Sequence, residues 1–168
     1  MKKLLLLGLS SLAFTAHAWE PTYYVGSGAS SWQFREHTST RDFTVGSLEA
    51  QAGIDLTPYT ALEARLGVGL NTARDEGVEL EAPYFASLYF KPQLRNDRAS
   101  LYGLLGMTTV EVDVTTEADA DTFTDMSYGI GVSFVLHPHV DLTAEWKKLI
   151  NADEFDARGG TIGFNYRF

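Results

Sequence analysis

Six charged side chains lie on the polar face of stretches in which polar and apolar residues alternate. They are three acids and three bases, namely Glu49, Glu63, Glu145, Arg65, Lys91 and Lys147. A buried charge without a partner is costly, so these side chains are expected to pair with one another. Equal numbers of acids and bases predict a closed, salt-bridged network, whereas a ring of one sign would favour an ion pathway. A narrow, gated pore is the alternative.

Acidic residues also gather in the segments between these stretches. The run Glu117-Ala-Asp-Ala-Asp-Thr-Phe-Thr-Asp125 has alternating carboxylates, but it lacks the glycine and the distal glutamate of an EF-hand. We interpret the acids as a solvated surface that repels its neighbours, with a divalent-cation site that bridges to phosphates as the alternative. The sequence therefore predicts no metal centre of its own and no cofactor.

Histidine is the residue that would carry general-base catalysis in this chain. His37 lies near Ser39 and Asp42, whereas His137 and His139 flank a prolyl turn. No His-x-Ser-Asn or Asp-Ser motif occurs anywhere in the sequence. We predict no catalytic residues and no enzyme activity, and we interpret His37 as a loop residue in water.

The elements that position the charged residues are predicted to be β-strands. In one stretch Leu62, Leu66 and Leu70 fall on one face, and Glu63 and Arg65 fall on the other. A tilted strand of about ten residues spans the hydrocarbon layer of an outer membrane. The same alternation recurs in eight stretches, which are Tyr23–Phe34, Thr44–Leu56, Thr60–Leu70, Pro83–Leu94, Ser100–Val114, Asp125–Leu136, Val140–Leu149 and Gly159–Phe168.

Two architectures accommodate such strands: a soluble β-sandwich with its apolar face inward, and a membrane barrel with its apolar face outward. The polar face is rich in Gly, Ser and Thr, which suits the crowded interior of a narrow barrel. Short connections alternate with longer polar ones, as in outer-membrane barrels, and the longer ones cover residues 35–43, 71–82, 115–124 and 150–158. We therefore predict an all-β fold, an eight-stranded antiparallel up-and-down transmembrane β-barrel.

Aromatic residues end the apolar rows, as the interfacial girdles of a membrane barrel require. Those expected at the periplasmic edge are Tyr23, Tyr59, Phe90, Tyr102, Phe134, Tyr166 and Phe168. Those expected at the outer edge are Trp32, Phe43, Tyr84, Tyr128 and Trp146.

Residues 1–18 are predicted to be a cleaved signal peptide, and residues 19–168 the barrel domain. Lys2 and Lys3 precede an apolar run too short to span a bilayer, and Ala16-His17-Ala18 has the small-x-small pattern of a cleavage site. Without Lys2 and Lys3, the 13 basic residues fall to 11 against 22 acidic ones, a net charge of −11. This charge argues against nucleic acid or anionic lipid headgroups as partners.

The sequence also carries the pattern of a known family. The segments Tyr23–Gly28, Tyr128–Lys148 and Gly160–Phe168 resemble the small eight-stranded outer-membrane β-barrel family, related to the OmpA transmembrane domain and the opacity-type surface proteins. The resemblance implies a bacterial outer-membrane location and a central charged network like that of OmpA. It also implies an assembly signal, read by the outer-membrane assembly machinery, at Ile162, Phe164, Tyr166 and Phe168.

The expected function is that of a non-enzymatic envelope protein. A barrel plugged by charged side chains would support the outer membrane, contact its lipid and lipopolysaccharide, and display its four longer loops to a host or surface ligand. Lipid A modifying enzymes exist on the same scaffold, so an enzyme of that kind is an alternative beside the narrow pore.

Overall fold

The computed structural model describes residues 20–36, 42–70, 73–75, 78–80, 84–112, 121–151 and 155–168. The predicted signal peptide lies outside these residues. The described part forms strands β1 (Thr22–Glu36), β2 (Asp42–Thr57), β3 (Thr60–Gly69), β4 (Ala73–Asp75), β5 (Val78–Leu80), β6 (Tyr84–Arg95), β7 (Ala99–Val112), β8 (Asp121–His137), β9 (Val140–Asn151) and β10 (Phe155–Arg167). Over these residues no helix is long and apolar enough to cross a membrane.

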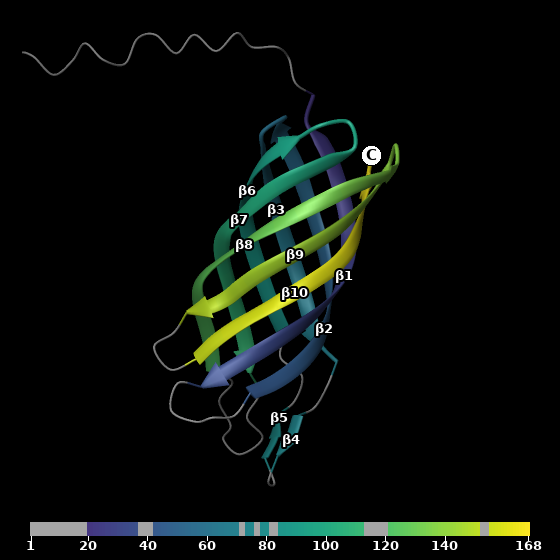
Figure 1. Cartoon of the computed structure of the whole chain (residues 1–168). Helices are drawn as coiled ribbons and strands as arrows, with labels where there is room; N and C mark the ends of the chain where they lie inside the picture. Colours follow the sequence, from purple (N-terminus) through teal and green to yellow (C-terminus); the bar gives the residue numbers. More distant parts are fainter. Residues whose placement is uncertain are drawn as a thin grey trace, which may run out of the picture.

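Eight of the strands form a closed antiparallel barrel in the order β1-β10-β9-β8-β7-β6-β3-β2. The wall closes where the first strand meets the last, with Val25 opposite Tyr166 and Ala29 opposite Ile162. Every barrel strand therefore has a hydrogen-bonded neighbour on both sides, as a β-structure in hydrocarbon requires. β1 begins and β10 ends at the same end of the barrel (Figure 1).

The predicted all-β barrel is confirmed, and all eight predicted strands are present. The structure corrects the outer ends, because β8 begins at Asp121 and β10 begins at Phe155, inside segments that the sequence assigned to loops. Backbone pairing continues there although the side chains turn polar, since ladder hydrogen bonds do not depend on side-chain character.

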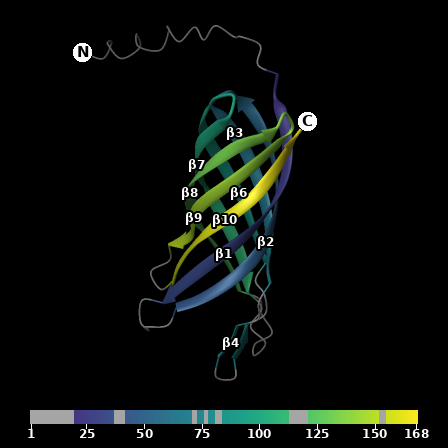
Figure 2. The ribbon, with the colours of Figure 1, turned by 45° about the vertical axis from the view of Figure 1, so that its right-hand side comes forward.

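The segment 71–82, expected to be a plain loop, contains a small hairpin. Within it Ala73 pairs with Leu80 and Asp75 with Val78. The β4–β5 hairpin stands beyond the barrel at the end opposite the chain termini, in both views of the molecule (Figure 1, Figure 2).

Side chains alternate between the outside and the inside along most of the described wall. On β3 the exposed Leu66 (66% exposed) stands beside the buried Arg65 (1% exposed). The same holds on β10, where Ile162 and Phe164 face outward and Thr161 and Asn165 face inward. The outer surface of the barrel is thus apolar and the interior polar, which is the inverse of a soluble β-sandwich.

The interior is narrow, and glycine makes room in it. Opposite each inward-pointing aromatic side chain of the described wall lies a glycine of the neighbouring strand. The pairs are Tyr24–Gly53, Trp32–Gly159, Phe85–Gly67, Tyr89–Gly106 and Tyr102–Gly131. A Cβ atom on Gly131 would lie 2.5 Å from Cε2 of Tyr102, so any other residue there would overlap the ring. The glycines thus leave the space that the rings occupy, and we call these positions glycine slots.

These pairs correct two of the predicted girdle positions. Trp32 and Tyr102 point into the barrel and are 2% exposed, instead of facing the membrane interface. The alternation along each strand explains the inward position, because Trp32 shares its face with the buried Ser30 and Tyr102 shares its face with the buried Leu104. The remaining predicted girdle residues with described side chains are exposed, and the Phe43 side chain lies outside the described part.

The Gly131 slot provides a test of this packing. Replacement by alanine is expected to lower the free energy of unfolding by about 1–3 kcal/mol, because the core around Tyr102 becomes overpacked. Urea titration of the refolded protein, followed by tryptophan fluorescence, measures the change. Gly160→Ala is the matched control, since a Cβ there would meet nothing nearer than 3.7 Å. Equal losses for both variants would contradict the slot interpretation.

Candidate functional site

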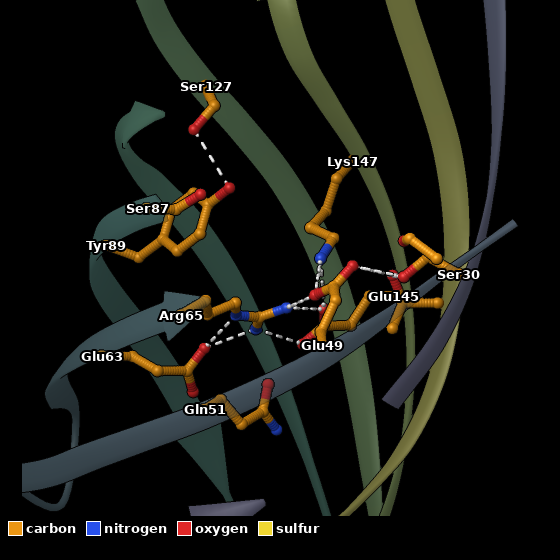
Figure 3. A network of polar contacts seen from close by, with 12 residues as sticks. Ser30, Glu49, Gln51, Glu63, Arg65, Ser87, Tyr89, Ser127, Glu145 and Lys147 are labelled. Atoms are coloured by element: carbon orange, nitrogen blue, oxygen red, sulfur yellow. Dashed lines mark hydrogen bonds and ion pairs between the residues drawn. The ribbon is translucent and has the colours of Figure 1, made fainter. Parts of the chain in front are cut away.

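The six charged residues singled out in the sequence meet inside the barrel and form what we call the central network: Glu49, Glu63, Arg65, Lys91, Glu145 and Lys147. Arg65 lies at its centre (Figure 3). Its guanidinium binds both oxygens of Glu145, with N–O distances of 2.6 and 2.8 Å. It also contacts Glu63 and lies 3.3 Å from Glu49. One cation therefore holds three carboxylates that come from three different strands.

The two lysines complete the charge balance. Lys147 Nζ lies 2.7 Å from Glu49 and 3.6 Å from Glu145, and Lys91 Nζ lies 3.1 Å from Glu63. Three acids thus face three bases in a region where all six side chains are almost completely buried. Buried ion pairs of this kind persist only when their remaining hydrogen-bonding capacity is also filled.

Hydroxyl groups fill that capacity. The Tyr24 hydroxyl donates to Glu63 over 2.6 Å, and the Tyr102 hydroxyl donates to Glu145 over 2.7 Å. Ser30 donates to Glu49 from the opposite side. Each acid of the central network accepts from cations and from at least one hydroxyl, so the network fixes the positions of its members.

Aromatic rings cover the cations of the central network. Lys91 Nζ lies 4.0 Å from the ring centroid of Tyr102 and 5.2 Å from that of Tyr24. Arg65 lies 5.3 Å from the Tyr89 ring, and Lys147 lies 5.2 Å from the Trp32 ring. Cation–π contacts at desolvated sites stabilise both partners, so the rings that rest in the glycine slots also hold the charges.

A second charged cluster, which the sequence analysis missed, lies at the end of the barrel that carries the chain termini. We call it the periplasmic network: Asp55, Arg95, Asp141 and Arg167. Arg167 binds Asp141 over 2.6 Å and Asp55 over 2.5 Å, and Arg95 lies 3.3 Å from Asp55. Gln93 also donates to Asp55. Two acids again meet two bases, at a separate level of the same lumen.

Toward the outer end, the central network is covered by uncharged side chains. The Trp32 and Phe85 rings meet edge to face with 6.3 Å between centroids. Trp32 Nε1 donates to Ser47 over 2.8 Å. A cluster of hydroxyls continues this layer, formed by Ser87, Tyr89, Thr108 and Ser127.

The alternation of inward and outward residues along the strands does indicate that the members of the periplasmic network point into the barrel. Asp55 shares a face with Glu49 and Gln51, and Arg167 shares a face with Asn165, so both are inward positions. Their spacing from the short connections places them at one mouth of the barrel. What the sequence did not show is which strand ends meet across the lumen, since that depends on closure and stagger.

The described residues contain neither His37, the candidate catalytic base, nor a candidate metal site. His37 lies outside them, as do most of the acidic loop residues. In the described part no group of three or more His, Asp or Glu side chains could hold a metal ion. His139 is exposed, interacts through Nδ1 with the carbonyl of Arg167 at 2.9 Å, and stacks on Tyr166.

The four residues expected to form the assembly signal lie on the outward face of the last strand. Ile162, Phe164, Tyr166 and Phe168 are all exposed. Tyr166 and Phe168 meet edge to face with 5.3 Å between their centroids. The amide of Phe168 donates to the carbonyl of Tyr23 over 3.0 Å, which adds a hydrogen bond at the closing seam.

Comparison with known families agrees with this architecture. Residues 4–168 match the model of the outer membrane protein beta-barrel domain, so the chain belongs to this family. It is an eight-stranded protein of the bacterial outer membrane. The strand ends near the chain termini, where the short connections lie, are the ones that we expect to be periplasmic. No curated protein matches the chain in sequence.

Solved structures share the fold at low sequence identity. The crystal structure of Ail from Yersinia pestis, in complex with the heparin analogue sucrose octasulfate, has a TM-score of 0.70 and 18% identity, covering 89% of this chain and 100% of that one. Neisserial surface protein A has a TM-score of 0.70 and 14% identity, with the same coverage. The N-terminal β-barrel domain of Pseudomonas aeruginosa OprF has a TM-score of 0.60 and 12% identity, covering 85% of this chain and 97% of that one.

The central position of Arg65 predicts a large effect of its removal. Arg65→Leu is expected to lower the free energy of unfolding by about 3–5 kcal/mol, because the three buried carboxylates lose their common partner. Urea titration in detergent micelles measures the loss.

Two further variants control this experiment. Arg98→Leu, in an exposed periplasmic turn, should change stability by less than about 0.5 kcal/mol. Arg65→Leu/Glu145→Leu restores charge balance, and should cost less than the sum of its single variants because the two residues are directly coupled. An additive double variant would contradict the central network as a coupled unit.

Proposed function

We propose that this protein is a closed, non-enzymatic barrel that supports the outer membrane and carries a contact surface at its outer end. The observation that supports this most is the presence of two self-neutralised ionic layers in series, the central network and the periplasmic network. An ion that crossed the lumen would have to break both. The interior of an eight-stranded barrel is just wide enough for its side chains to fill.

Charge balance within each layer argues against the narrow pore. A cation or anion pathway needs binding sites of one sign, which are weak enough to release the ion again. Here every acid of the central network already accepts from a cation and a hydroxyl. This charge pairing supports the proposal that the side chains in the lumen serve stability and shape and close the barrel as a plug.

The contact surface consists of the four outer loops, at residues 35–43, 71–82, 115–124 and 150–158. The β4–β5 hairpin lies within the second loop and stands beyond the end of the barrel. These segments are rich in acids in the sequence, including Asp75, Glu76, Glu79 and Glu81 in the second loop alone. A host or surface ligand with basic or neutral groups suits them, whereas a polyanion such as the sucrose octasulfate bound to Ail does not.

The exposed row Ile162, Phe164, Tyr166 and Phe168 supports a further part of the proposal, recognition of the last strand by the outer-membrane assembly machinery. Phe168→Ala should reduce the amount of folded protein in outer membranes far more than Phe134→Ala, an equally outward aromatic residue on β8. Heat-dependent mobility on SDS gels of membranes from expressing cells measures the folded amount. Equal reduction would count against a recognised signal.

Conductance in planar bilayers tests the closed lumen. The refolded wild-type protein, with its insertion verified by heat-dependent gel mobility, is expected to produce no discrete current steps. Each ionic layer blocks the lumen independently, so Lys91→Glu or Arg65→Glu alone should also remain silent as long as the variant folds. Wild-type current that disappears in either charge-reversal variant would establish the pore instead.

Surface labelling tests the outer contact surface. A short epitope inserted between Asp75 and Val78 should be detected by antibody on intact cells, because the hairpin faces outward. The same epitope inserted between Asn96 and Arg98, in a periplasmic turn, should be detected only after the outer membrane is permeabilised. The reverse pattern would overturn the orientation and, with it, the proposed contact role.

A further inference from the structure

Four aromatic rings form a continuous row at the base of the barrel, across the turn between β8 and β9 and the end of β10. The His137 and His139 rings lie 6.2 Å apart between centroids, and the His139 ring stacks on Tyr166 at 5.8 Å with 23° between the planes. Tyr166 in turn meets Phe168 edge to face. The row therefore joins the β8–β9 turn to two residues of the assembly signal proposed above.

His139 holds the end of β10 by three contacts. Its backbone carbonyl accepts from the amide of Arg167 over 2.8 Å, and its ring Nδ1 donates to the carbonyl of Arg167 over 2.9 Å. The stacked ring also covers one face of Tyr166, the residue before Arg167. Backbone pairing alone would fix the strand but leave the Tyr166 side chain free to change rotamer. The ring contact therefore adds control over where the Tyr166 ring points.

These contacts join two strands that follow each other in the chain, since His139 and Arg167 are only 28 residues apart. The other ties at the end of β10 reach the first two strands. Arg167 binds Asp55 of β2 across 112 residues, and the Phe168 amide donates to a carbonyl of β1. Closing a longer loop costs more conformational entropy, so the contacts between β9 and β10 form more readily before the barrel closes.

The edge of β10 that faces β1 becomes paired only when the barrel closes. In the finished barrel β10 has β9 on one side and β1 on the other. A β9–β10 pair without β1 presents a row of unpaired backbone groups on that edge, which is a template for another protein to pair with. Along the same strand the proposed signal points outward, through Ile162, Phe164, Tyr166 and Phe168. A partner on this edge can therefore contact the backbone and the rings together.

We infer that His139 is a positioning residue for the recognition of the last strand by the outer-membrane assembly machinery. It holds β10 extended on β9 and Tyr166 in an outward rotamer, so that the machinery binds a preformed strand edge instead of an unordered segment. This inference rests on the proposed recognition of β10 and adds the residue that prepares β10 for it. Ordering the segment before binding lowers the entropy that is lost at binding, and this strengthens the complex.

Binding of the unfolded chain to the purified assembly machinery tests the inference. Residues 19–168, labelled with a dye at the amino terminus and diluted from urea, are titrated with the machinery in detergent, and fluorescence anisotropy measures capture. His139→Ala should weaken the apparent affinity about fivefold, and His139→Phe, which keeps a ring but loses the Nδ1 donor, about twofold. His137→Ala is the matched control in the same turn, where its ring adjoins that of His139, and it should bind like the wild type.

Phe168→Ala separates the inference from the proposal on which it rests. This variant should bind more than about tenfold more weakly, because it removes a proposed contact with the machinery. Unchanged affinity in His139→Ala beside a weakened Phe168→Ala overturns the positioning role alone, and so does an equal loss in His137→Ala. Unchanged affinity in Phe168→Ala overturns the recognition of β10 and, with it, the positioning role.

Spontaneous refolding separates positioning from a purely structural role of His139. Without the machinery, His139→Ala should reach the wild-type folded yield in detergent micelles, because the pairing of β9 with β10 and the lumen networks remain. Heat-dependent gel mobility measures this yield. A folded yield that falls as much as the binding affinity would mean that His139 only stabilises the barrel, and this too overturns the inference.

Discussion

The structure depends on one constraint, which is that every backbone amide and carbonyl at membrane depth must be paired within the protein. The pairing of β1 with β10 satisfies it and turns a row of hairpins into a closed wall. Closure of the barrel then determines how much space the inward side chains have. The lumen of an eight-stranded wall has a set width, so the inward side chains must fill it and satisfy one another.

The central network and the glycine slots both allow large side chains to fit within the narrow lumen. Arg65 serves three carboxylates at once because its planar guanidinium carries five donors. Tyr102 fits because Gly131 lies under its ring, and from there its hydroxyl reaches Glu145 while its face covers Lys91. Packing and charge pairing are thus parts of one arrangement, and a change in one disturbs the other.

Alternation along the chain sufficed to predict the eight strands and the inward position of the six charges, because both are local properties. The same alternation also indicates that Trp32 points inward. It was nevertheless assigned to the outer girdle, because aromatic residues are expected at the membrane interface. The periplasmic network could not be derived in the same way. Asp55 and Arg167 are 112 residues apart, and their contact depends on the stagger between strands that only the closed barrel defines. The β4–β5 hairpin was missed because strands of three residues are too short for a periodic pattern.

Arg167 is the penultimate residue of the chain, and it neutralises acids contributed by β2 and β9. An incomplete barrel would therefore hold Asp55 and Asp141 at its base with Arg95 as their remaining basic partner in the periplasmic network. Charge balance at the base is reached only when the last strand is in place. A barrel without β10 would therefore be less stable for two reasons. Its acids at the base would lack Arg167 as a basic partner, and its edge strands would lack hydrogen-bonded neighbours.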